Sequence, residues 1–168
     1  GHTPGPAWVG AYDTPGNAWA VAAAGQHVYV ADQFAGLMVI DVSTPSSPSL
    51  AGSYDTPGEA YDVKIAGDHA FVADGSSGIQ VIDISDPTTP VSVGSYDTPG
   101  NAISIDIDGD RAYLADRGNG LVVVNIGYLP HPTLLDMYDT PGDCWGVAAS
   151  GDHVYLGDAL QGIHVIDV

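Results

Sequence analysis

Four aspartates recur at the same point of a repeating pattern and could together bind metal ions. Each closes a short apolar run, and they lie 42 residues apart: Asp32, Asp74, Asp116 and Asp158. A second set, at the same spacing, precedes Thr-Pro-Gly: Asp13, Asp55, Asp97 and Asp139. Calcium prefers carboxylate and carbonyl oxygens, so the first set predicts candidate Ca²⁺ ligands, and Ca²⁺ is the only cofactor suggested. The alternative is that these carboxylates cap backbone N–H groups in a repeated turn, and no EF-hand sequence favours calcium.

A second polar group interrupts a pattern of small residues. Asp62, Lys64 and Asp106 stand where other repeats have Ala20, Ala22, Gly146 and Ala148. A lysine beside carboxylates can shift pKa values enough for catalysis, which suggests a small hydrolase or metal-dependent enzyme. A satisfied ion pair is the alternative. Because no G-x-S-x-G, H-E-x-x-H, P-loop or C-x-x-C sequence occurs, we expect a protein that is not an enzyme.

Short loops that differ between repeats provide a third candidate site. Their tips read Gln33-Phe34-Ala35, Gly75-Ser76-Ser77, Arg117-Gly118-Asn119 and Ala159-Leu160-Gln161. Variable tips on a constant frame are where recognition could reside, although sequence drift also costs least there. If these loops bind a ligand, Phe34 and Arg117 are the best anchors.

The elements that position these residues follow from an internal repeat. The sequence Tyr-Asp-Thr-Pro-Gly begins at Tyr12, Tyr54, Tyr96 and Tyr138, so the period is 42 residues. A fixed period in the range of about 20–50 residues is typical of solenoids, propellers and arrays. We expect one domain over residues 1–168, divided into repeats 1–42, 43–84, 85–126 and 127–168.

Each repeat predicts four short antiparallel strands and no helix. Apolar residues alternate along one strand, a Gly-polar pair predicts a tight hairpin, and a nearly continuous apolar run follows a glycine. The expected strands in chain order are 7–12, 18–24, 27–32, 37–42, 49–54, 60–66, 69–74, 79–84, 91–96, 102–108, 111–116, 121–126, 133–138, 144–150, 153–158 and 163–168. Four-stranded units of this length are typical of β-propeller blades, and a β-solenoid is the runner-up.

These residues also resemble a known family. Leu37–Asp41, Ile79–Asp83 and Leu121–Asn125 are similar to the LVIVD repeat, and the Gly-Ser-Tyr-Asp-Thr-Pro-Gly runs at 52–58 and 94–100 fit it too. The resemblance covers the whole chain, and the fourth repeat departs most, with Gly157 in place of alanine. It implies a β-propeller, often in surface or secreted proteins of bacteria or archaea, and it implies no activity.

The order of the predicted strands leaves the last blade without a fourth strand at the C-terminal end of the chain. Three complete blades span 17–58, 59–100 and 101–142, whereas residues 143–168 supply only three strands. We expect the strand at 7–12 to complete this last blade, in the same or a partner chain, because a bare strand edge invites aggregation. The outer side chains are mostly small and could not fill wide gaps between blades, so they favour a small angle between neighbouring blades. A ring of eight blades has a smaller angle than a ring of four, and we therefore expect a strand-swapped homodimer with an eight-bladed ring. A closed four-bladed monomer and a strand-donating filament are the alternatives.

The net charge of the protein limits the classes of partner that it can bind. Twenty-one acidic residues and three basic ones give a net charge of −18, which argues against nucleic acid and anionic membrane surfaces. No apolar run is long enough for a transmembrane helix, so we expect no membrane insertion. Together with the family resemblance, the acidic composition predicts an extracellular or cell-surface scaffold whose only implied partner is another copy of itself.

Overall fold

The structure is a computed structural model that describes residues 5–168, and these residues form antiparallel strands and no helix. Blade 1 contains β1 (Ala20–Ala24), β2 (His27–Ala31), β3 (Leu37–Asp41) and β4 (Ser49–Tyr54). Blade 2 contains β5 (Asp62–Ala66), β6 (His69–Ala73), β7 (Ile79–Asp83) and β8 (Val91–Tyr96). Blade 3 contains β9 (Ser104–Asp108), β10 (Arg111–Ala115), β11 (Leu121–Asn125) and β12 (Thr133–Tyr138). Blade 4 contains β13 (Cys144–Ser150), β14 (His153–Asp158) and β15 (Gly162–Asp167).

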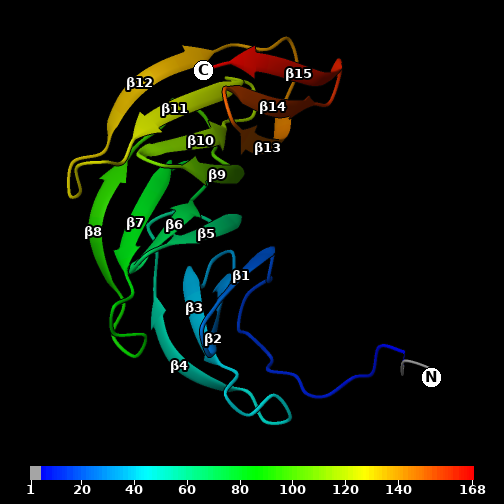
Figure 1. Ribbon diagram of the computed structural model, residues 1–168, viewed down its shortest axis with the longest axis vertical. Helices are drawn as coiled ribbons and strands as arrows, with labels where there is room; N and C mark the ends of the chain where they lie inside the picture. The colour runs from blue at the N-terminus through cyan, green and yellow to red at the C-terminus, as the bar shows by residue number, and fades with distance from the viewer. Residues whose placement is uncertain (1–4) are drawn as a thin grey trace.

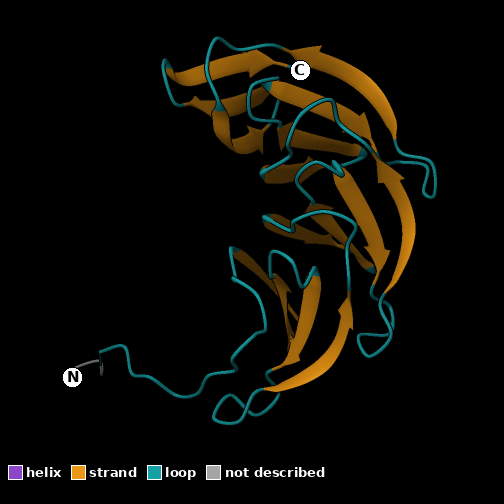
Figure 2. Cartoon of the chain, turned by 180° about the vertical axis from the view of Figure 1, so that it is seen from behind, coloured by secondary structure: helices purple, strands orange, loops and turns teal. Residues whose placement is uncertain are grey.

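The four blades stand side by side in an open arc (Figure 1). Within each blade the strands pair in chain order. The first strands, β1, β5, β9 and β13, lie on the concave side, and the fourth strands, β4, β8 and β12, lie on the convex side (Figures 1 and 2). Blades 1 and 4 form the two ends of the arc, so the chain does not close on itself. The result is a propeller-like fold with an open ring.

Hairpin chemistry explains the tight links between the first two strands of each blade. Gly25, Gly67, Gly109 and Gly151 occupy these turns with φ between 55° and 61°. Such positive φ values are readily adopted by glycine, which has no Cβ to clash. The predicted hairpins are therefore confirmed in all four repeats.

The core lies between neighbouring blades. Leu37 and Val39 of β3 are fully buried against Ala60 and Val63 of blade 2, and the same pattern joins blade 2 to blade 3 and blade 3 to blade 4. Alternate residues of a strand point to opposite faces, so one face of each blade packs on the next blade and the other face packs on the preceding one. Isolated backbone bridges add a direct link between blades: Gln33 to Ala60, Gly75 to Ala102, and Arg117 to Cys144.

Fifteen of the sixteen predicted strands are present within two residues of their expected ends. The exception is residues 7–12, which form no strand, so this prediction is wrong for the single chain. The segment runs away from the arc at the free side of blade 1, far from the edge of β15 (Figure 2). No strand edge lies beside it to complete its hydrogen bonds, and an extended segment without such a partner is not a sheet strand.

The same segment nevertheless lies where the outer strand of a preceding blade would lie. A Cβ on Gly10 would collide with the carbonyl oxygen of Pro45 in the link after β3. Gly52 of β4 approaches Pro87 of blade 2 in the same way, and Gly94 of β8 approaches Pro130. Gly10 thus contacts blade 1 in the same way as the outer strands of blades 1 and 2 contact the blades that follow them.

Among the described residues no helix is long and apolar enough to cross a membrane.

Candidate functional site

Each of the four recurring aspartates is buried and contacts the turn that enters its own blade. Thr98 Oγ1 donates a hydrogen bond to Asp116 Oδ1 at 2.7 Å, and the Gly100 N–H donates to Asp116 Oδ2 at 2.8 Å. The same pair of contacts joins Thr56 and Gly58 to Asp74, and Thr14 and Gly16 to Asp32. This geometry fixes the Thr-Pro-Gly turn against the end of the second strand, which is the capping alternative that the sequence left open.

The fourth repeat keeps only part of this arrangement. The Gly142 N–H still donates to Asp158 Oδ2 at 3.0 Å, but Thr140 Oγ1 donates to the Gly142 carbonyl oxygen instead. Asp158 Oδ1 accepts hydrogen bonds from the N–H groups of Leu160 and Gln161. Thr140 Oγ1 also lies 3.0 Å from Sγ of Cys144, which is fully buried and stands where the other repeats have Ala18, Ala60 and Ala102.

These environments move the pKa values in opposite directions. Burial raises the pKa of Asp74 and of Asp116 above the ordinary value, although the threonine hydroxyl and the glycine N–H act against it. Burial also acts to raise the pKa of Asp158, but three backbone N–H donors outweigh it and leave that pKa lowered. An ionised carboxylate that accepts several N–H bonds is stabilised in its charged form.

The calcium hypothesis gains no support from this arrangement. Both oxygens of Asp32, Asp74, Asp116 and Asp158 are already engaged by the turns. Within residues 5–168 no three His, Cys, Asp or Glu side chains gather closely enough to hold a metal ion.

The polar residues of the concave side connect one blade to the next. Asp62 Oδ2 accepts hydrogen bonds from the Ser104 hydroxyl and the Ile105 N–H, both at 3.0 Å. Asp106 Oδ2 accepts one from the Ala149 N–H at 2.9 Å, and its Oδ1 lies 3.6 Å from Nζ of Lys64. The structure therefore brings Lys64 and Asp106 together as an ion pair and gives Asp62 a separate bridging role.

The two predicted loop anchors do not meet. Phe34 is exposed and lines a shallow hollow with Pro57, Gly58 and Gly75. Arg117 lies elsewhere, with its guanidinium 5.0 Å from the centre of the Trp145 ring, a cation–π arrangement. The structure thus places Phe34 and Arg117 in two separate hollows.

Arg117 belongs instead to a pocket that the sequence analysis missed. This rim pocket, of about 490 Å³, is lined by Trp19, Ala20, Tyr61, Asp62, Ile103, Ser104, Arg117 and Trp145. Its four largest apolar side chains, at positions 19, 61, 103 and 145, are again 42 residues apart. Comparing equivalent positions of the repeats would have found them, because the large side chains stand at the start of each first strand.

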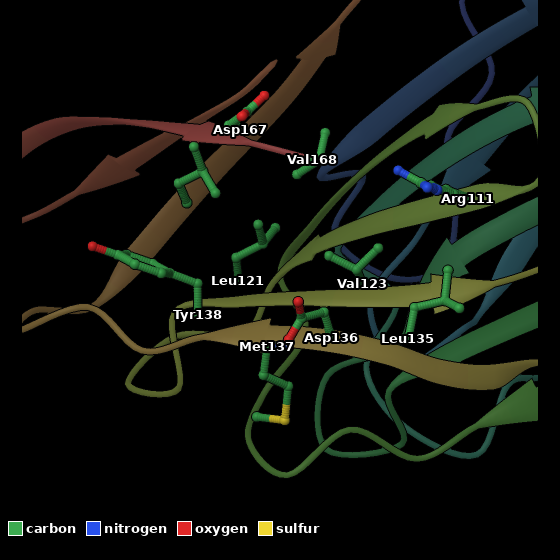
Figure 3. Close-up of a pocket in the computed structure, with 10 residues that line it drawn as sticks. Arg111, Leu121, Val123, Leu135, Asp136, Met137, Tyr138, Asp167 and Val168 are labelled. Atoms are coloured by element: carbon green, nitrogen blue, oxygen red, sulfur yellow. The ribbon is translucent and has the colours of Figure 1, made fainter. Parts of the chain in front are cut away.

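A second groove lies beside the incomplete blade 4 (Figure 3). This outer groove, of about 380 Å³, is lined by Arg111, Leu121, Val123, Leu135, Asp136, Met137, Tyr138, Ile166, Asp167 and Val168. It lies between β12 and the free edge of β15 (Figures 1 and 3). In blades 1 to 3 a fourth strand pairs with the third strand, so the outer groove adjoins a strand edge that is paired in the other three blades.

Apolar side chains are also exposed at both ends of the arc. Ile163 and Val165 of β15 are 70% and 59% exposed, whereas their counterparts in the other blades are buried. At the opposite end, Val21 of β1 is 65% exposed, although Val63 and Ile105 at the same position are buried. The two ends therefore present the two complementary faces that pack together at every internal junction between blades.

Two computationally designed proteins are among the solved structures that share this fold. The crystal structure of the computationally designed Ika4 protein superposes with a TM-score of 0.77 at 12% identity, over 98% of this chain and 99% of Ika4. The computationally designed Ika8 protein gives a TM-score of 0.73 at 12% identity, over 89% of this chain and 45% of Ika8, so this chain spans less than half of Ika8. At such low identity the likeness concerns the fold alone.

Sequence comparison identifies the family. No curated protein has a sequence that matches this chain. The model of the LVIVD repeat matches four consecutive segments, at residues 15–56, 57–98, 99–140 and 141–168. These segments cover most of the chain and reproduce its period, and the protein belongs to the LVIVD-repeat family.

Proposed function

We propose that this protein is a non-catalytic repeat scaffold that assembles with a second copy by strand exchange. In the assembly, residues 7–12 of each chain occupy the outer groove of the other, and two open arcs close one ring of eight blades. The observation that carries the proposal is the exposure of Val21 at one end of the arc and of Ile163 and Val165 at the other. These positions are buried at each junction within the chain, and burying them again is favoured by the hydrophobic effect.

The repeats define the register of the exchanged strand. In blade 1, Leu37 pairs with Tyr54, Val39 with Gly52, and Asp41 with Ser49. Adding the repeat period places Ile163 opposite Tyr12 of the second copy, Val165 opposite Gly10 and Asp167 opposite Ala7. The N-terminal segment is already on the correct side of its own blade 1, as the contact of Gly10 with Pro45 indicates. Strand addition to a free edge is an established mode of association.

The concave carboxylates fit a scaffold better than a hydrolase. Asp62 and Asp106 each accept a backbone N–H of the following blade, and Lys64 pairs with Asp106. These contacts join neighbouring blades, which supports a structural role for both carboxylates. The strongly acidic composition and the family support a location outside the cell or on its surface.

Chemical crosslinking in solution tests both the exchange and its register. The double variant Ala7→Cys/Asp167→Cys, treated with a short thiol crosslinker, should give a covalent species of two chains. The single variants Ala7→Cys and Asp167→Cys are the controls, and the native Cys144 is buried and should not react. A crosslinked single chain would show instead a closed four-bladed monomer, a ladder of larger species would show a filament, and either would refute the dimer.

A further inference from the structure

The rim pocket is lined by two tryptophans whose rings are largely exposed. Trp19 is 60% exposed and Trp145 57% exposed, and both line this pocket. Trp19 immediately precedes β1, and Trp145 is the second residue of β13; both are strands of the concave side. The rings of Trp19 and Tyr61 lie 5.9 Å apart and are tilted by 53°. Exposed apolar surface gathered in one concave place marks a binding site more often than chance. The volume of about 490 Å³ also falls within the usual range for small-molecule sites.

Polar side chains line the same pocket as these aromatic rings. Arg117 contributes a guanidinium whose Nε is buried and has no hydrogen-bond partner. Ser104 and Asp62 line the same pocket, where the Ser104 hydroxyl donates a hydrogen bond to Asp62 Oδ2 at 3.0 Å. Glu59 Oε2 accepts hydrogen bonds from the Tyr61 hydroxyl at 2.7 Å and from Gln33 at 3.0 Å. Donors and acceptors are therefore both available around the aromatic surfaces.

The backbone holds two of these polar residues in an uncommon conformation. Arg117 has a φ of 44° and Gln33 a φ of 50°, while the equivalent Gly75 adopts a φ of 58°. A side chain other than glycine is disfavoured at positive φ, and such strain is found most often at functional sites. The first and third repeats thus carry long polar side chains at a position where glycine would fit more easily.

The charges around the pocket select the class of ligand. A cation would be repelled by Arg117, and an anion would be repelled by Asp62. A neutral molecule with a flat C–H face and several hydroxyl groups satisfies both the aromatic rings and the mixed donors and acceptors. We propose that the rim pocket binds a neutral saccharide, with Trp19 and Trp145 contacting the sugar face and Arg117, Asp62 and Ser104 contacting its hydroxyls. Every one of these residues belongs to one chain, so this proposal does not depend on the dimer.

Titration with neutral sugars tests the proposal. We would titrate the intact protein with cellobiose and with maltose, and follow tryptophan fluorescence and the heat of binding. Sorbitol supplies hydroxyls without a flat ring, and tetramethylammonium supplies a cation for the aromatic rings. At least one disaccharide should give a saturable signal that sorbitol and tetramethylammonium do not give. The proposal is overturned if neither disaccharide binds, or if either comparison compound binds as well as the disaccharides.

Substitutions of the pocket tryptophans test whether the disaccharide binds in the rim pocket. Trp145→Ala should weaken disaccharide binding about tenfold or more, and Trp145→Phe should retain most of it because an aromatic face remains. Trp19→Ala is a second variant, and both tryptophans are exposed, so their removal should leave the melting temperature nearly unchanged. Tyr128→Ala, an equally exposed aromatic residue in the link after β11, is the matched control and should bind as the wild type does. Unchanged binding by both tryptophan variants would refute the assignment.

Discussion

In blades 2 and 3 a buried threonine hydroxyl and a buried aspartate fix the blade to the turn before it. The contact between Thr98 and Asp116 is representative, and both side chains are buried. A hydrogen bond to a charged group contributes about 1.5–3 kcal/mol to stability. We therefore expect Thr98→Val to lower the free energy of unfolding by about that amount, as measured by urea denaturation at fixed protein concentration.

The fourth repeat supplies the matched control for this substitution. Thr140 is also buried, but its hydroxyl donates to the Gly142 carbonyl at 3.2 Å and not to Asp158. Thr140→Val should therefore cost less than about 1 kcal/mol. Equal losses from both variants would mean that the hydrogen bond to the aspartate is not what stabilises the turn.

The raised pKa values of Asp74 and Asp116 predict an unusual dependence of stability on pH. In the unfolded chain an aspartate has a pKa of about 3.9. Because the folded state holds these protons more tightly, the free energy of unfolding should rise as the pH falls from neutral through the raised pKa values to about 4. Below that pH, protonation of Asp158, whose pKa is lowered, should reduce it again. Urea denaturation across this range checks the sign, and a steady loss of stability from neutral pH downwards would contradict it.

At the scale of the elements, glycine in the outer strands sets how closely neighbouring blades approach. A Cβ on Gly52 would lie 2.5 Å from the carbonyl oxygen of Pro87 in the next blade. Gly52→Ala should thus force the blades apart and cost about 1–3 kcal/mol in denaturation experiments. Gly146→Ala is the control, since a Cβ there meets nothing within 4 Å, and it should be neutral or stabilising by up to about 1 kcal/mol. A neutral Gly52→Ala would show that the blade junction is not tightly packed.

The strands could be predicted from the sequence because every repeat carries the same alternation and the same turn residues. The segment at residues 7–12 has that pattern too, but a strand also needs a neighbouring edge, which no local pattern provides. The recurring aspartates were harder to interpret, because metal binding and turn capping use the same carboxylates at the same spacing. The residues Trp19, Tyr61 and Trp145 were missed because they look like ordinary apolar residues until the fold places them on one rim.

At the scale of the whole molecule, the open arc has two complementary ends that a single chain leaves unpaired. In the proposed dimer, closure by a second copy would bury Val21, Ile163 and Val165, which are exposed in the single chain, and would fill the outer groove. The cost is electrostatic, because each copy carries a net charge of −18 and like charges repel. Salt screens this repulsion, so the dimer should be tighter at high ionic strength than at low ionic strength.

The mass of the protein in solution, determined by light scattering at low and high salt, tests the central claim most directly. We expect twice the 17.2 kDa of one chain, with the dimer favoured as salt increases. A mass of 17.2 kDa at every concentration and salt level would contradict the account and leave a monomer. A large and polydisperse mass would also contradict it, since it would mean that the exchanged strands join successive copies without closing a ring.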